Sequence, residues 1–421
     1  MHPFTYHDHQ LHCEATPLWV IADAVGTPTY VYSGGAILSA YEAYERALAD
    51  LPHLSCYAVK ANMNLGVLAL LARAGAGADV VSGGELYRAL RAGFEPQRIV
   101  FAGVGKLRDE IREGLKADVL CFNVESSSEL SAIDDVARAE GARARIALRV
   151  NPDIDPETHP YIATGLKTSK FGIPYREARE LYRRAAGLAG IEVVGVHMHI
   201  GSQLTKVTPI ADALGRLEEL VLGLRQDGIP LRYLDVGGGV GIRYREESPP
   251  SPAEYVRALK PALERLGLTV LLEPGRSIVG HAGALLARVL YRKETEGRRF
   301  LVADAAMNDL IRPALYNAYH EIRPVAEPAP GTTPEIVDVV GPVCESADFL
   351  AKERPLPPVP EGGLIAVLSA GAYSFAMASN YNARPRAAEV LVHGDRFQVV
   401  RRRESYEDLI SGESAWDGRE P

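Results

Sequence analysis

The chain has 421 residues, of which 47% are hydrophobic and 24% charged, the proportions of an ordinary globular protein. Its 54 acidic residues outnumber its 46 basic ones, and the net charge of −8 argues against a nucleic-acid partner, which needs a basic face. No apolar run approaches about 18 residues, so we expect no membrane span, and the amino-terminal stretch lacks the pattern of a signal peptide.

Short apolar runs alternate with amphipathic helical patterns through the first two thirds of the chain. The runs fall at 54–59, 78–81, 98–101, 118–122, 144–150, 191–199, 231–236 and 269–273. The helical patterns between them fall at 65–74, 84–92, 105–116, 127–140, 175–188, 208–227 and 252–266. Strands that alternate with helices predict parallel βαβ units, and eight such units match the size of a (β/α)₈ barrel. A doubly wound open sheet is the alternative, because the number of runs does not exclude it.

The pattern changes after residue 280. Apolar runs at 283–292, 299–303, 335–340, 363–368, 387–392 and 396–402 have no long helices between them, and prolines cluster at 324–334 and 355–360. This predicts a mostly antiparallel β domain, a sandwich or small barrel, over 281–421. The segment 29–32 is expected to contribute a strand to this β domain. The predicted class is therefore α/β plus all-β, with 1–34 joining the β domain and 35–280 forming the barrel.

Reactive side chains fall where the predicted barrel strands end. Lys60 ends the first run, Arg149 lies near the end of the fifth, and His199 ends the sixth. A run of glycines, 237–239, follows the seventh, and Glu273 ends the eighth. In a parallel barrel these ends meet at one mouth, where such barrels keep their active sites. A charged residue that merely closes a strand explains any one of them, but five at one face favour a site.

Two of these features suggest a cofactor. Successive glycines after Asp235 leave backbone N–H groups open to an anion such as phosphate, although a tight turn explains them equally well. Ile242 breaks the G-x-G-x-x-G spacing, so a dinucleotide site is disfavoured. Lys60 follows an apolar strand, where partial desolvation makes its amine available for an imine; a lysine reaching out to solvent is the simpler alternative. An imine-forming lysine together with a phosphate site suggests pyridoxal 5′-phosphate.

Seven motifs then carry a resemblance over essentially the whole chain. They are YAVKAN (57–62), HMHIGSQ (197–203), DVGGGVG (235–241), EPGR (273–276), RPALY (312–316), GPVCES (341–346) and GAYSFAMASNYNARPRAAEVLV (371–392). In content and order they resemble the diaminopimelate decarboxylases, a family of pyridoxal-phosphate enzymes with the alanine-racemase-like fold. The resemblance implies release of CO₂ from the D-centre of meso-diaminopimelate to give L-lysine. It also implies a cytoplasmic homodimer with shared active sites.

The resemblance assigns roles at the cofactor. Lys60 would hold it through an imine, His199 would stack on its ring, and Glu273 would pair with the pyridine nitrogen. Further cofactor contacts are expected from Asp79, Arg149, Ser202, Gly237, Gly238, Gly239, Pro274, Gly275, Arg276 and Tyr373. A carboxylate at the nitrogen keeps it protonated and makes the ring a strong electron sink. Racemases of this fold place an arginine there, so Glu273 favours a decarboxylase.

The resemblance also assigns substrate contacts, to Arg276, Arg312, Tyr316, Glu345 and Tyr373. Arg312 and Tyr316 are spaced i,i+4, so on a helical turn they face the same way, and a guanidinium with a phenol suits the distal carboxylate. A weak surface ion pair is the alternative for Arg312. Cys344 would donate a proton in the neighbouring subunit's site, whereas a lone loop cysteine is otherwise more often passive.

Other functions compete with this one. A decarboxylase for ornithine, arginine, carboxynorspermidine or a carrier-bound glutamyl group is the nearest, but plain diamine precursors offer no distal carboxylate for Arg312. An inactive relative that only binds a partner would have lost cofactor residues such as Lys60 and Glu273. A cofactor carrier would consist of a barrel alone, whereas this sequence predicts a β domain as well.

Metal binding and disulfides are not expected. His7, His9 and His12 beside Cys13 are more typical of an exposed strand edge than of a metal site. The four cysteines, Cys13, Cys56, Cys121 and Cys344, form no CxxC pair, which favours a reducing cytoplasm. The segment 159–172 is expected to be a loop at the barrel mouth.

Overall fold

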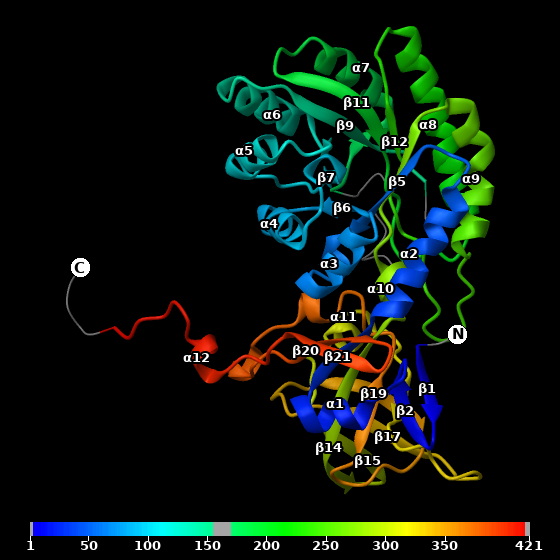
Figure 1. Cartoon of the computed structure of the whole chain (residues 1–421), viewed down its shortest axis with the longest axis vertical. Helices are drawn as coiled ribbons and strands as arrows, with labels where there is room; N and C mark the ends of the chain where they lie inside the picture. The colour runs from blue at the N-terminus through cyan, green and yellow to red at the C-terminus, as the bar shows by residue number, and fades with distance from the viewer. Residues whose placement is uncertain (1–2, 155–169, 417–421) are drawn as a thin grey trace. The chain divides into compact units, whose positions relative to one another are not determined.

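The structure, a computed structural model, describes residues 3–154 and 170–416. The chain divides into two compact units: Ala36–Gly280 in one, and Met1–Gly35 with His281–Pro421 in the other. Figure 1 follows the chain through both units by colour. No helix in the described ranges is long and apolar enough to cross a membrane.

The first unit is a parallel barrel. Its strands in the described chain are β5 (His53–Ala58), β6 (Gly77–Val80), β7 (Ile99–Phe101), β8 (Cys121–Val124), β9 (Ala144–Asn151), β11 (Ile191–His197), β12 (Tyr233–Asp235) and β13 (Thr269–Leu272). Each pairs with the next in parallel, and β13 returns to β5 with Leu271 opposite Leu54. That last pairing closes the circle, so the predicted barrel is confirmed and the open sheet is excluded. A short strand, β10 (Ile173–Pro174), pairs with β9 outside the circle.

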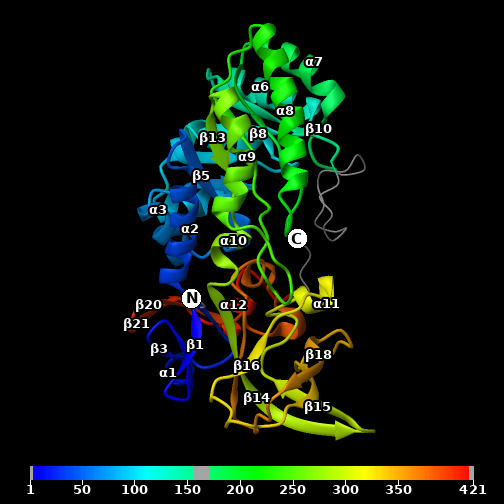
Figure 2. The ribbon, with the colours of Figure 1, turned by 90° about the vertical axis from the view of Figure 1, so that its right-hand side faces the viewer.

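Helices surround the strands, as Figures 1 and 2 show. They are α2 (Gly34–Leu48), α3 (Leu65–Arg73), α4 (Gly83–Ala92), α5 (Arg108–Ala117), α6 (Ser127–Ala139), α7 (Tyr175–Ala186), α8 (Thr208–Gln226), α9 (Pro252–Leu266) and α10 (Arg276–Val279). Serine caps start several of them soon after a strand ends. Ser82 Oγ accepts from the Glu85 amide at 3.2 Å before α4, and Ser126 Oγ accepts from the Glu129 amide at 3.1 Å before α6. Such caps satisfy amide groups that the first helical turn leaves open, and they fix the short loops at the mouth.

The second unit is built on β-sheets. Its elements are β1 (Phe4–His7), β2 (Gln10–Cys13), β3 (Thr16–Pro17), α1 (Leu18–Val25), β4 (Thr29–Ser33), β14 (Gly283–Thr295), β15 (Arg298–Ala303), α11 (Arg312–Tyr316), β16 (Ile322–Pro324), β17 (Glu335–Val340), β18 (Phe349–Leu356), β19 (Leu364–Val367), β20 (Ala388–His393), β21 (Arg396–Arg401) and α12 (Tyr406–Leu409). One sheet has the order β1-β2-β3, and the larger has the order β18-β17-β15-β14-β4-β20-β21, with β19 pairing with β14 and β16 pairing with β19. Its pairings are mostly antiparallel, but β15–β17 and β20–β4 are parallel. The amino-terminal β4 therefore lies between two strands that come from beyond residue 280.

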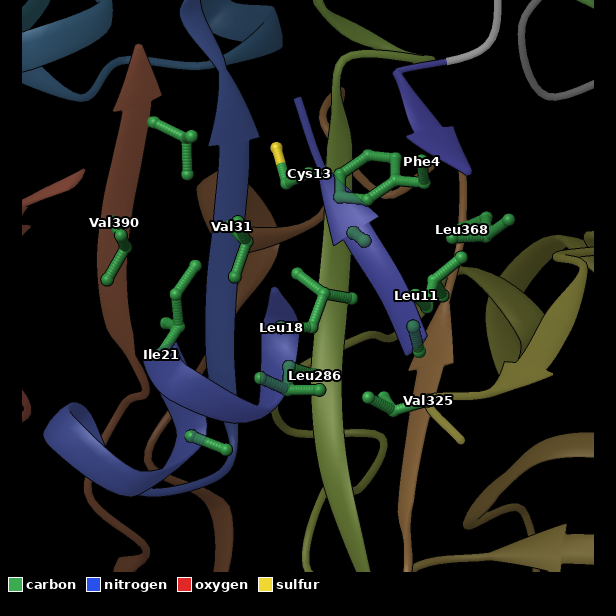
Figure 3. Close-up of a cluster of buried hydrophobic side chains, with 14 residues drawn as sticks. Phe4, Leu11, Cys13, Leu18, Ile21, Val31, Leu286, Val325, Leu368 and Val390 are labelled. Carbon is green, nitrogen blue, oxygen red and sulfur yellow. The ribbon is translucent and has the colours of Figure 1, made fainter. Parts of the chain in front are cut away.

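The amino-terminal segment contributes a buried core to this unit. Figure 3 shows Phe4, Leu11 and Leu18 packed with Val31 of β4 and Leu286 of β14. In the β1–β2 hairpin His7 and His9 are exposed and Cys13 is buried.

One of the proline clusters lies partly in a strand. The proline cluster 355–360 begins inside β18, where Pro355 lies opposite Ile336 of β17. β18 is at the edge of its sheet, and an edge strand tolerates a residue without an N–H donor.

Candidate active site

Lys60 lies at the barrel mouth in a single 3₁₀ turn, Val59–Ala61, directly after β5. Its ammonium group forms an ion pair with Asp79 of the neighbouring strand β6. The Lys60 side chain is 35% exposed, whereas Asp79 is fully buried. Burial raises the pKa of Asp79 and the charge of Glu273 adds to the rise, while Lys60 opposes it. The amine is thus accessible from the mouth, and its partner is fixed inside the barrel.

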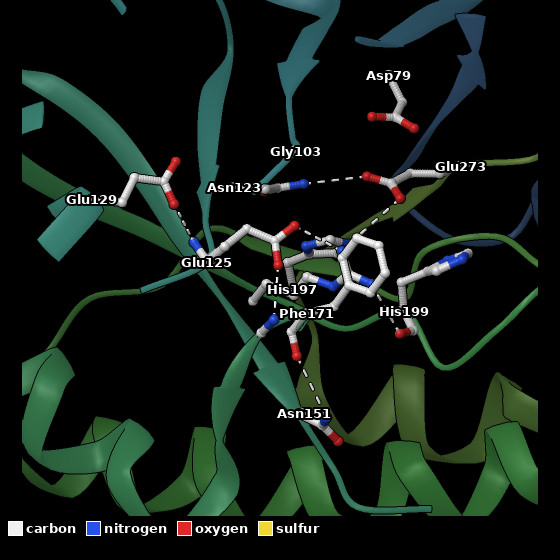
Figure 4. A network of polar contacts seen from close by, with 12 residues as sticks. Asp79, Gly103, Asn123, Glu125, Glu129, Asn151, Phe171, His197, His199 and Glu273 are labelled. Carbon is white, nitrogen blue, oxygen red and sulfur yellow. Dashed lines mark hydrogen bonds and ion pairs between the residues drawn. The ribbon is translucent and has the colours of Figure 1, made fainter. Parts of the chain in front are cut away.

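Glu273 is buried directly after β13. Its Oε1 accepts from Asn123 Nδ2 at 3.2 Å, and its Oε2 lies 3.4 Å from His197 Nε2. Figure 4 shows this contact with Asn123. Burial alone would raise the pKa of Glu273, but His197 and then Lys60 outweigh it and hold that pKa below its usual range. Glu273 is therefore an anion in the interior of the barrel.

Asp235, the last residue of β12, is a second buried carboxyl beside it. Asn123 Nδ2 also donates to Asp235 Oδ2 at 3.2 Å, and the Gly237 amide donates to Oδ1 at 2.9 Å. Burial and then the charge of Glu273 raise the pKa of Asp235 well above its ordinary value. His197, Asp235 and Glu273 also form the one cluster of metal-ligand type found in the described residues, with ligand atoms within 4.8 Å of one another. We interpret it as a charge network around Glu273.

The glycine turn after β12 packs against backbone. Gly237 and Gly239 have φ of +68° and +108°, a region that favours glycine. A Cβ at Gly238 would lie 2.0 Å from the main-chain oxygen of Glu273. The Gly238 amide donates to His199 Nδ1 at 3.2 Å. Burial and then the charge of Arg149 lower the pKa of His199, so its ring is neutral.

Arg149 of β9 is held by hydrogen bonds to neighbouring residues. Its guanidinium donates to Glu125 Oε1 at 2.7 Å and to the main-chain oxygen of His199 at 3.3 Å. The Phe171 ring lies 4.7 Å from that guanidinium, and Glu125 Oε2 accepts from the Gly172 amide at 2.8 Å. Glu125, Phe171 and His199 are labelled in Figure 4. Of the loop expected at 159–172, residues 159–169 lie outside the described part of the chain.

Arg276 begins α10 and is almost fully buried. It donates to the Tyr244 hydroxyl at 2.8 Å and to Ser202 Oγ at 3.1 Å. Gly275 precedes it, after Pro274, and a Cβ there would lie 3.0 Å from the Cβ atoms of Ala58 and Ala61. Glycine thus allows the EPGR segment to pack closely against the turn that carries Lys60.

The other predicted site residues lie in the second unit. On α11 the Arg312 guanidinium lies 5.7 Å from the centre of the Tyr316 ring. Arg312 is only 6% exposed, which does not fit a surface ion pair. Cys344 is exposed on a loop, where its amide donates to Asn382 Oδ1 at 2.8 Å, and Glu345 follows it. Tyr373 is half-buried with a φ of +54°.

Sequence reasoning did not select Asn123, His197, Asp235 or Tyr244 as site residues. Three of them lie in the barrel strands β8, β11 and β12, at or next to the carboxyl end. The strand-end pattern that indicated Lys60 and Glu273 could have found them. Tyr244 lies in an irregular segment, for which that pattern gives no signal.

Comparisons with known proteins identify the family. Residues 35–280 match the family described as the pyridoxal binding domain of pyridoxal-dependent decarboxylases. The chain is 55% identical to the diaminopimelate decarboxylase of Pseudomonas aeruginosa over 98% of its length and 99% of that protein's. It is 48% identical to that of Aquifex aeolicus, with 96% of each chain covered. The structure of the Helicobacter pylori diaminopimelate decarboxylase complexed with L-lysine superposes with a TM-score of 0.90 at 45% identity, covering 94% of this chain and 98% of that one.

The residues at the mouth fit pyridoxal 5′-phosphate. Lys60 offers a partly exposed amine, and Glu273 offers a buried anion. Asp79 Oδ1 is buried without a hydrogen-bond partner among the described residues. One carboxylate oxygen next to the Lys60 amine therefore has no donor in the described part of the chain. The chain belongs to the pyridoxal-dependent decarboxylases and, within them, to the family of diaminopimelate decarboxylases.

Proposed function

We propose that the protein removes CO₂ from the D-centre of meso-diaminopimelate and releases L-lysine. The observation that carries this proposal is the arrangement of Lys60 and anionic Glu273, which follow the carboxyl ends of the adjacent strands β5 and β13. Identity of 55% with a diaminopimelate decarboxylase over nearly the whole length supports the choice of substrate.

The barrel residues prepare the loss of CO₂. Pyridoxal 5′-phosphate, when bound, supplies a sink for the electron pair left behind by the departing carboxyl group. Lys60 provides the amine that holds it covalently, and Glu273 holds a proton at the pyridine nitrogen because a buried anion favours the charged ring. His199, neutral and fixed by Gly238, presents its flat ring for stacking. The remaining cofactor contacts are Asp79, Arg149, Ser202, Gly237, Gly238, Gly239, Pro274, Gly275, Arg276 and Tyr373.

Substrate recognition and proton return fall to other groups. Arg312 and Tyr316 bind the distal carboxylate, aided by Arg276 and Tyr373, and Glu345 accepts hydrogen bonds from the distal ammonium group. The carbon that loses CO₂ must gain a proton, which the Cys344 thiol donates.

We further propose that the enzyme is a homodimer in which Cys344 and Glu345 serve the neighbouring subunit's site. The exposure of Cys344 supports this, because an exposed loop thiol is accessible to a second copy. A cytoplasmic location is supported by the four cysteines, all of which are free.

The experiment is a substrate panel with the purified, cofactor-loaded protein. meso-Diaminopimelate, L-lysine, L-ornithine and L-arginine are each assayed for CO₂ release and for the identity of the product. We expect CO₂ and L-lysine from meso-diaminopimelate alone, and no turnover by the Lys60→Ala control. A preference for lysine, ornithine or arginine would overturn the substrate assignment.

A further inference from the structure

Asn123 lies inside the barrel near the end of β8 and is fully buried. Cys121 is two residues earlier, so both side chains point to the same face of the strand. The Cys121 thiol donates to Asn123 Oδ1 at 3.9 Å. The amide oxygen thus faces Cys121, and its NH₂ group faces the carboxyl groups of Asp235 and Glu273.

That NH₂ group contacts two carboxyl groups at once. It donates to Glu273 Oε1 and to Asp235 Oδ2, each at 3.2 Å. Asn123 thus connects the seventh and eighth strands of the barrel from the opposite side of its interior, because β8 pairs with β7 and β9 and not with β12 or β13.

Two buried carboxyl groups this close do not both ionise. The amide offers each of them a donor without adding charge, so the other groups around each carboxyl decide which one is the anion. His197 lies 3.4 Å from Glu273 Oε2, and Lys60 adds to its effect. The pKa of Glu273 accordingly falls below its usual range, while burial and the charge of Glu273 raise that of Asp235.

We propose that Asn123 is a positioning residue for the decarboxylation: its amide holds Glu273 and Asp235 in place and keeps Glu273 available as the anion that faces the cofactor's ring nitrogen. The inference rests on the proposed role of Glu273. Asn123 itself acts through Glu273 and does not touch the reacting atoms.

The test replaces Asn123 by Asp, which has nearly the same shape but adds a third carboxyl group and removes both donors. The pKa of Glu273 then rises, because its anion loses a hydrogen bond and gains a like-charged neighbour. We expect kcat to fall about tenfold to a hundredfold, the range for a lost hydrogen bond to a charged group, with KM changed by less than about threefold. The loss grows as the pH falls, because Glu273 takes up a proton in the variant before it does in the parent.

A second readout does not depend on turnover. The absorbance of the bound cofactor, titrated with pH in the absence of substrate, should show its transition at higher pH in Asn123→Asp than in the parent.

Asn64→Asp is the matched control: Asn64 caps α3 by accepting from the Gly66 amide at 2.8 Å, and aspartate caps equally well. This control should leave kcat and the titration unchanged. If Asn123→Asp does not fold, Asn123→Ser, which keeps one donor and adds no charge, should change both readouts in the same direction by a smaller amount.

Glu273→Gln separates the inference from its premise. If Glu273→Gln lowers kcat but the Asn123 variants leave the pH profile and the absorbance titration as in the parent, Asn123 is merely structural and the inference is overturned. If Glu273→Gln leaves kcat unchanged, the proposed role of Glu273 and this inference are both wrong. A parallel shift of both readouts in Asn123→Asp supports the inference.

Discussion

Replacement of Arg312 by alanine tests how the substrate is chosen. Arg312 is 6% exposed, its Nε lies 3.4 Å from His320 Nε2, and its guanidinium lies over the Tyr316 ring. A guanidinium this buried is desolvated already, so a carboxylate that binds it meets little competition from water. Removing one partner of a buried ion pair costs about 3–5 kcal/mol, because the other charge is left unpaired.

At about 1.4 kcal/mol per tenfold, this cost lowers kcat/KM for meso-diaminopimelate by a factor of at least about a hundred. Activity on L-lysine, which lacks the distal carboxylate, should not fall. The assay is CO₂ release from each substrate across a range of concentrations, with the melting temperature measured in parallel.

Arg323→Ala provides the matched control. Arg323 belongs to the same unit and pairs with Glu321 at 2.6 Å, but both side chains are partly exposed, so the pair contributes at most about 1 kcal/mol. We expect this variant to keep full activity. Equal losses on every substrate in Arg312→Ala, together with a large fall in melting temperature, would contradict a role of Arg312 in binding the distal carboxylate, because they would indicate a damaged fold.

Three further predictions concern the cofactor and the assembly. Borohydride should fix the cofactor to the peptide that contains Lys60; fixation to Lys106, whose ammonium donates to Glu129 at 2.7 Å, would place the site elsewhere. Glu273→Gln should lower kcat far more than it changes KM, and a change confined to KM would mean that Glu273 only binds substrate. Lys60→Ala and Cys344→Ala homodimers should be nearly inactive, but mixing them should restore activity toward about a quarter of the parent's. No recovery after demonstrated subunit exchange would exclude a shared site.

The barrel was predictable because its signal is local. Each strand is a short apolar run, and each predicted strand end marks where a functional side chain can lie. Lys60 and Glu273 were found in this way, from positions 213 residues apart in the chain, whereas closure of the barrel needed the β13–β5 pairing that only the structure gives. The strand β18 with its proline was not predicted, because tolerance of proline depends on being at a sheet edge, and edge position is a property of the whole sheet.

The polar interior was harder to predict, for a physical reason. Asn123 and Asp235 look like ordinary polar residues in short strands, and nothing local says that they face the same carboxylate. Their roles follow from which strands lie across the barrel from one another.

A buried carboxyl group also costs free energy unless it is paired, so Asp79, Asp235 and Glu273 in one interior would not be retained for stability alone. Lys60, His197 and Asn123 offset part of that cost, and Asp79 Oδ1 still lacks a partner among the described residues. Such a concentration of buried charge is typical of a catalytic site, where stability is sacrificed for chemistry.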